Sequence, residues 1–246
     1  MVARDPAEAR RRFDILRAVG GLAGPIVFTG AWMTGTALQN GDYSIAFEHL
    51  SGLAALNAVH PEIMIGGFVA LGAGTALFAG ALEDALGGKP SSGAGPRMIR
   101  AAGLATIAAG LLRRDHILLH PPYGGTDVSW HNYGHDAASA LIYALLITAP
   151  FVLARRFRDD PQWQAWRVPA LASGLATTLL LGLFWSKLIE PYNGIVQRIA
   201  VTIPAAAVAA LAVGVLRKIT DAGRRPPASR PSWQAVVRGF RHASLR

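Results

Sequence analysis

Histidine and acidic side chains gather in the segment RRDHILLHPPYGGTDVSWHNYGHD, which covers residues 113–136. His131 and His135 stand four residues apart, so they share one face if a helix begins by His131. Two imidazoles on one helix face suit a divalent metal, and a nearby carboxylate can add a third ligand. The spacing therefore raises the hypothesis of a divalent metal such as zinc, with the ligands Asp115, His131 and His135.

Other interpretations of the same segment stay open. His116 and His120 repeat the spacing, but the second histidine of that pair precedes a proline, which disfavours helical geometry there. His, Tyr and Trp are also common at membrane surfaces, so the segment could be interfacial structure alone. The remaining hypothesis is acid–base or polar-ligand chemistry without a metal, and its candidate catalytic residues are Ser51, Asp115 and His135.

Long apolar runs surround these polar groups. The chain has 246 residues, of which 52% are hydrophobic, and its mean hydropathy is +0.31. Six runs approach the ~20 residues that a helix needs to cross a bilayer, and they lack the polar stripe of soluble helices. The sequence predicts an all-α, polytopic bundle of six transmembrane helices, at residues 18–38, 61–82, 98–112, 136–154, 168–186 and 197–216.

The positive charges predict the orientation of the bundle. With six spans, 20 of the 24 Lys and Arg residues fall on the side of the two termini. Lys and Arg are retained in the cytoplasm during insertion, so both termini are expected there. We therefore expect a multi-pass protein of a bacterial inner (plasma) membrane. It divides into a cytoplasmic segment 1–17, a transmembrane domain 18–216 and a basic cytoplasmic tail 217–246.

The tail has the pattern of an interfacial amphipathic helix. Trp233, Val236, Val237 and Phe240 fall on one helical face, which favours a helix lying in the membrane surface over a disordered basic tail. The basic cytoplasmic side is expected to meet membrane lipids, in particular anionic head groups. No nucleic-acid-binding motif accompanies the charge, so nucleic acid is not expected as a partner. The chain has no Cys, which excludes disulfides and cysteine nucleophiles.

The opposite, extracytoplasmic side holds most of the titratable groups. Its loops and the adjoining helix ends contain six of the seven histidines. Ionisable groups at membrane depth usually face the protein interior or a watery cavity. We therefore expect a polar pocket at the extracytoplasmic face. Arg198 should turn into the bundle, to pair with an acidic residue or a lipid phosphate. The candidate substrate-binding residues are Glu48, His49, Gln197 and Arg198.

Three stretches together resemble a known family. They are GDYSIAFEHLSGL from Gly41, AAGLATIAAGLLRRDHILLHPP leading into GHDAASALIYALL, and GIVQRIAV from Gly194. Their order resembles the family called domain of unknown function 998, over most of residues 15–217. The resemblance implies a six-helix fold and no established activity. The positions that match its motifs are Tyr43, Ser44, His49, Ser51, Leu53, Asp115, His135, Gly194, Gln197 and Arg198.

The chain departs from the family pattern at two places. Arg113 and Arg114 stand where the family often has Phe-Pro, and Gln197 stands where it often has Glu. A remoter resemblance links the chain to the alkaline ceramidases and progestin-type receptors, which hold a zinc ion with three histidines and use a nearby Ser and Asp. Their helix number and motif order differ from those of this sequence.

Three classes of function follow from these observations. The first is a membrane enzyme, metal-assisted or not, that acts on a lipid or isoprenoid at the outer leaflet. The second is a non-catalytic binding, sensing or assembly protein. The third is a small transporter, which is less favoured because no ionisable residue lies near the middle of any predicted span.

Overall fold

The computed structural model describes residues 6–41, 43–87, 93–117, 128–186 and 188–224. Within these ranges the chain is all-helical, as predicted, and contains no β-strand. Short 3₁₀ helices lie in the connections: η1 (Leu50–Ala54), η3 (Gln164–Trp166) and η4 (Glu190–Tyr192). The long helices are α1 (Pro6–Ala37), α2 (Pro61–Ala85), α3 (Ala94–Leu111), α4 (Trp130–Arg158), α5 (Arg167–Trp185) and α6 (Asn193–Arg224).

The helices have the length and composition of membrane spans. Five of them, α1, α2, α4, α5 and α6, are long and apolar enough to cross a bilayer. The third predicted span coincides with α3, which has 18 residues and carries Arg97 and Arg100 in its first two turns. At 1.5 Å per residue α3 extends about 27 Å, close to the thickness of a hydrocarbon core. The chain is thus a multi-pass membrane protein.

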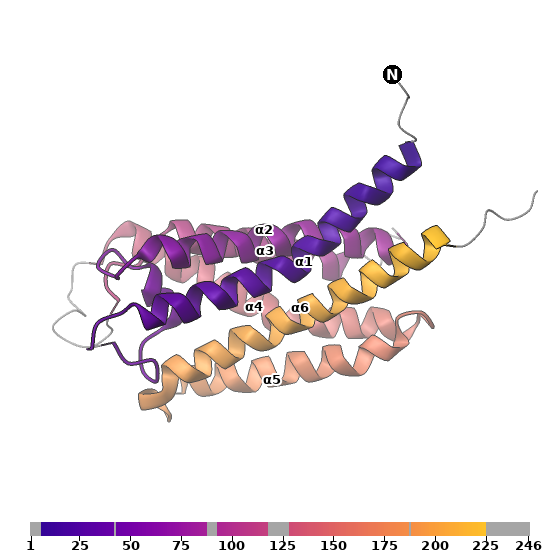
Figure 1. Cartoon of the computed structure of the whole chain (residues 1–246). Helices are drawn as coiled ribbons and strands as arrows, with labels where there is room; N and C mark the ends of the chain where they lie inside the picture. Colours follow the sequence, from indigo (N-terminus) through magenta and orange to yellow (C-terminus); the bar gives the residue numbers. More distant parts are fainter. Residues whose placement is uncertain (1–5, 42, 88–92, 118–127, 187, 225–246) are drawn as a thin grey trace, which may run out of the picture.

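The six helices form a closed ring. Each helix packs against the helices before and after it in the chain, and α6 returns to pack against α1. The first part of α1 and the last part of α6 extend beyond one end of the bundle, while the 38–60 and 186–192 connections lie at the other end (Figure 1). The ring therefore has a terminal end and a loop end, with an interior bounded by all the helices.

Glycines let α1, α2 and α3 approach closely. A Cβ on Gly74 would overlap the carbonyl oxygen of Gly20, and a Cβ on Gly72 would overlap that of Gly103. Small residues at such crossings bring helix backbones into van der Waals contact, which drives association inside a bilayer. Part of the high glycine content thus has a packing role.

Two apolar clusters fill the ends of the ring. Toward the terminal end, Phe78 and Leu82 of α2 pack with Phe157 and Val215. The ring of Phe157 also stacks on Trp163 at a centroid distance of 5.7 Å. Toward the loop end, Leu50 and Leu53 of η1 pack with Phe28, Met64 and Phe68.

Cations surround the C-terminal end of α2. Arg156 Nη2 and Lys218 Nζ donate hydrogen bonds to the carbonyl oxygens of Leu86 and Ala85. Arg17 forms ion pairs of 2.5 Å with both Asp14 and Asp84. These contacts satisfy the last carbonyls of α2 and complement its dipole. The predicted amphipathic helix of the tail lies outside the described residues.

Candidate functional site

The start of α6 docks on the 38–60 loop. A Cβ on Gly194 would lie 2.5 Å from the carbonyl oxygen of Glu48 and 2.6 Å from that of Ile45, so the loop rests directly on the helix backbone. The amide of Ile195 donates a hydrogen bond of 3.2 Å to the carbonyl of Ala46. Only a glycine at residue 194 permits this approach.

Arg198 holds the same loop from inside. It is 4% exposed, and its Nη1 donates hydrogen bonds to the carbonyl oxygens of Glu48 at 2.9 Å, Gly194 at 2.9 Å and Ile45 at 3.2 Å. Its Nη2 donates to the Tyr43 hydroxyl. The side chain turns into the bundle, as expected from the sequence. Its hydrogen-bond acceptors, however, are three backbone carbonyls and a phenol, with the buried Glu48 carboxyl as a nearby charge.

Gln197 joins the loop to α4. Its Oε1 accepts a hydrogen bond of 2.7 Å from the amide of Leu50, and its Nε2 donates one of 2.8 Å to the hydroxyl of Tyr143. All three residues are buried. The amide side chain thus connects η1 to the interior face of α4.

The described residues that follow α3, 112–117, also pack on this loop. Arg113 donates to the carbonyls of Ala54 and Ala55 at 3.2 and 3.0 Å. The amide of Ile117 donates to Asn57 Oδ1 at 2.8 Å. A Cβ on Gly52 would lie 2.7 Å from the carbonyl oxygen of Ile117. The loop after α1 and residues 112–117 after α3 therefore form one packed layer over the end of the ring.

Two histidines lie beneath this layer. His49 packs its ring on Phe184 at a centroid distance of 4.9 Å. Burial, together with the charges of Arg114, Arg198 and His135, lowers the pKa of His49 to about 3. The Nδ1 atom of the buried His135 lies 2.7 Å from the carbonyl oxygen of Ala109 and 3.0 Å from that of Leu112. Since both partners are acceptors, His135 carries its proton on Nδ1, and Nε2 is an acceptor.

His49 should stay neutral at pH values where a solvent-exposed histidine is charged. In the unfolded chain it takes up a proton near pH 6.5, whereas in the folded chain its pKa is about 3. Between these values the unfolded state binds more protons, so stability falls as the pH falls from about 6.5 towards 3. The NMR resonance that His49→Gln removes should not shift between about pH 7 and pH 4.5. A midpoint near pH 6 for that resonance would contradict the burial argument.

Asp115 and His131 belong to a network at the start of α4. Ser129 donates from its amide and its hydroxyl to the Asp115 carboxylate, at 2.8 and 2.5 Å. Ser129 Oγ in turn accepts from the amide of Asn132 and lies 2.6 Å from His131 Nδ1. Burial raises the pKa of Asp115, but the Ser129 hydrogen bonds and nearby histidines hold it below its usual value. Ser129 is thus the N-cap of α4, and Asp115 orients it.

The predicted metal ligands do not converge. Among the described residues, no three His, Asp or Glu side chains lie close enough together to hold a metal ion, so Asp115, His131 and His135 do not form such a group. His131 turns to Ser129, whereas His135 turns to the end of α3. The i, i+4 spacing is present, but these hydrogen bonds engage the two rings separately. His120 lies outside the described residues.

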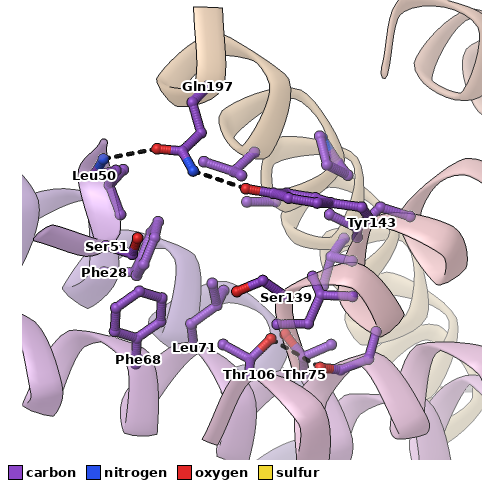
Figure 2. Close-up of a pocket in the computed structure, with 17 residues that line it drawn as sticks. Phe28, Leu50, Ser51, Phe68, Leu71, Thr75, Thr106, Ser139, Tyr143 and Gln197 are labelled. Carbon is purple, nitrogen blue, oxygen red and sulfur yellow. Dashed lines mark hydrogen bonds between the residues drawn. The ribbon is translucent and has the colours of Figure 1, made fainter. Parts of the chain in front are cut away.

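A cavity of about 80 Å³ is lined by η1 and by α1, α2, α3, α4 and α6. We call it the central cavity. Its polar lining residues are Ser51, Thr75, Thr106, Ser139, Tyr143 and Gln197, and the rest of its lining is apolar (Figure 2). A second cavity of about 60 Å³ adjoins it. The two share the lining residues Thr75, Ala102, Leu146, Pro204 and Val208.

The central cavity differs from the polar pocket that the sequence suggested. Of the candidate site residues, Ser51 and Gln197 line it, whereas Glu48, His49, Asp115, His131, His135 and Arg198 do not. Arg198, Asp115, His131 and His135 make hydrogen bonds at the covering loops and helix ends, and His49 packs on Phe184. In the described residues, the structure therefore has a mostly apolar cavity beneath a polar layer, where the sequence suggested a pocket lined by titratable groups.

The family model of the Protein of unknown function (DUF998) family matches residues 22–214. The chain belongs to this family. It matches no curated protein and no solved structure. The match covers all six helices of the ring, apart from the first part of α1 and the end of α6.

In this DUF998 chain, two of the stretches that carried the family resemblance contact each other directly. Gly194, Gln197 and Arg198 come from the stretch at the start of α6, and all three touch the stretch that contains Tyr43 and Leu50. The motif positions therefore build the contact between the loop and α6. His135 and Asp115, from the middle stretch, fasten the start of α4 nearby.

Sequence reasoning missed Tyr143 and Ser139, which both line the central cavity of the DUF998 chain. They lie on α4 within an otherwise apolar run, eight and four residues after His135. That spacing repeats every four residues and returns to roughly the same helix face. A search for polar residues in register with His135 would have found both.

Proposed function

We propose that the protein is a six-span inner-membrane protein that binds the apolar chain of a lipid-like or isoprenoid molecule in the central cavity. Both termini lie in the cytoplasm, and the loop layer faces the extracytoplasmic side. The protein holds the ligand without changing it chemically. The family match supports the membrane-embedded helical domain, and the cavity supports the choice of ligand.

The adjacency of the two cavities carries this proposal. Together they extend from the polar groups near Ser51 and Gln197 to the mostly apolar surroundings of Leu153 and Leu211. Each volume is several times the ~10–15 Å³ that one water molecule needs. A narrow space with a polar end and an apolar remainder matches an amphiphile that inserts chain first. Small-molecule sites between the helices of bundles have this mixed lining.

The arrangement of Ser51 favours binding over catalysis. A serine nucleophile needs a base within hydrogen-bonding reach. In the described part of the chain, Ser51 shows no hydrogen bond to a His, Asp or Glu side chain. His135 donates its Nδ1–H to two carbonyls, and among the described residues no hydrogen bond joins its Nε2 to Ser51. Ser51 is therefore assigned to the ligand-facing lining, with no part in an acyl-transfer reaction.

Filling the cavity should abolish ligand binding. Ala205 lines the central cavity, so Ala205→Phe places a ring inside it. The neighbouring Ala206 is exposed on α6 and lines neither cavity, so Ala206→Phe is the matched control. Native mass spectrometry of the detergent-purified protein should detect a co-purified amphiphile in the wild type and the control, but not in Ala205→Phe. Equal occupancy in both variants would place the ligand elsewhere.

The proposed orientation has a direct test. The chain has no Cys, so single-cysteine labelling is free of background. Gly41→Cys, at the loop end, should react with a membrane-impermeant thiol reagent in intact cells. Gln162→Cys, between α4 and α5, should react only after the cells are opened. The reverse pattern would invert the topology and move the loop layer to the cytoplasm.

This orientation also supports the partners expected from the sequence. The cations around the end of α2 would lie at the cytoplasmic surface, where anionic lipid head groups are plentiful. Exposed basic side chains of α1, such as Arg12, would add to this contact. We include anionic lipids at the cytoplasmic face in the proposal, and no nucleic acid.

A further inference from the structure

Two hydrogen bonds join Leu50, Gln197 and Tyr143 beside the central cavity, and the donor and acceptor of each are fixed. The amide of Leu50 can only donate, so the atom of Gln197 that it meets at 2.7 Å is the carbonyl oxygen. This fixes the side-chain amide, and its NH₂ group must face Tyr143 at 2.8 Å. The Tyr143 oxygen therefore accepts this hydrogen bond, as Figure 2 shows.

Tyr143 is left with a proton to donate. A phenol can accept and donate at once, and Gln197 uses only the accepting side. Tyr143 is 9% exposed and lines the central cavity. The hydroxyls of Ser51 and Ser139 also line the central cavity (Figure 2). A buried donor without an acceptor is costly, so the cavity at Tyr143 is suited to an oxygen atom supplied by a ligand.

No charged side chain lines either cavity in the described residues. Of the cations of the loop layer, Arg198 already donates to three carbonyls and to Tyr43, and Arg114 pairs with Asp136. A phosphate or carboxylate in the cavity would therefore be a buried anion without a partner, which is strongly unfavourable. The lining selects an uncharged head group.

From this geometry we infer that the ligand is a single-chain amphiphile whose head is an uncharged hydrogen-bond acceptor, such as a ketone or ester carbonyl, and that Tyr143 is the specificity-determining donor. This inference rests on the proposed chain-binding function. It adds the chemical class of the ligand: the head oxygen accepts from the Tyr143 hydroxyl, and the chain extends toward Leu153.

The test uses the full chain in nanodiscs of zwitterionic lipid and a long-chain alkyl diazirine that has no head group. Light attaches the probe to the helices that line the cavity, and peptide mass spectrometry measures the labelling. Three competitors of equal chain length are compared: an alkane, a methyl ketone and an alkyl phosphate. The ketone should displace the probe at a concentration about threefold to tenfold lower than the alkane, the effect of one neutral hydrogen bond. The phosphate should compete no better than the alkane.

In Tyr143→Phe, labelling by the probe should persist. The ratio of the concentrations at which the alkane and the ketone displace the probe should fall to about one. Persistent labelling shows that the cavity is intact in this variant. Tyr133→Phe is the matched control, because Tyr133 is exposed on α4 and should leave the ratio unchanged. An unchanged ratio in Tyr143→Phe, or a phosphate that competes better than the ketone, would overturn the inference and leave chain binding intact. Probe labelling that does not fall in Ala205→Phe would instead overturn the proposed function itself.

Discussion

Arg198→Lys should lower the free energy of unfolding by about 3 kcal/mol, which corresponds to losing one or two hydrogen bonds of a charged group. The guanidinium reaches three carbonyls and the Tyr43 hydroxyl from two of its nitrogens. A lysine ammonium keeps the charge but lacks the planar fork that spans these acceptors. Chemical unfolding in detergent micelles, followed by circular dichroism, measures the change.

Arg158→Lys provides the matched control. Arg158 lies at the end of α4, pairs with Asp159 and has 54% of its side chain exposed. Exposed ion pairs contribute little, so the unfolding midpoint of this variant should match that of the wild type. If Arg198→Lys were equally silent, Arg198 would not be holding the loop, and the buried contacts would have no energetic role.

Gly194→Ala should destabilise the protein by about 1–3 kcal/mol, the usual cost of overpacking. The added methyl group would press on the backbone oxygens of Ile45, Ala46 and Glu48, which cannot move aside as a flexible side chain can. Relief requires that the loop lift from α6. Such movement would also lengthen the hydrogen bonds of Arg198, and the same unfolding experiment measures the combined loss.

Gly182→Ala is the corresponding control on α5. A Cβ at Gly182 would meet nothing within 4 Å. Alanine has the higher helix propensity, so this variant should be stabilised by up to about 1 kcal/mol. A destabilised Gly182→Ala together with a neutral Gly194→Ala would contradict the prediction. The close approach of the 38–60 loop to α6 would then not explain the glycine at residue 194.

The helices could be predicted well from the sequence because apolar runs of about 20 residues have few alternatives in a membrane protein. The inward turn of Arg198 was also predictable, since a charge at that depth must find partners. Its acceptors were not. They are main-chain carbonyls of the 38–60 loop, and every residue type carries a carbonyl, so the sequence contains no signal for them.

The histidine pair shows why the site was harder to predict than the fold. The i, i+4 spacing of His131 and His135 is compatible with a metal, but the two rings turn to different local partners. Ser129 caps α4 and engages His131, and the C-terminal carbonyls of α3 engage His135. The apolar part of the central cavity left no sequence signal, because its lining has the same composition as any buried helix face.

The reach of Arg198 across the chain has a consequence for biogenesis. Its acceptor at Ile45 precedes it by 153 residues, so the 38–60 loop is synthesised long before the residue that binds it. Until the sixth helix enters the bilayer, the carbonyls of Ile45 and Glu48 lack the guanidinium that binds them in the folded chain. The contact between α6 and the 38–60 loop can therefore form only after all six helices have been inserted. In a chain arrested before Gly194, this loop would lack that contact and would be exposed to membrane-surface proteases.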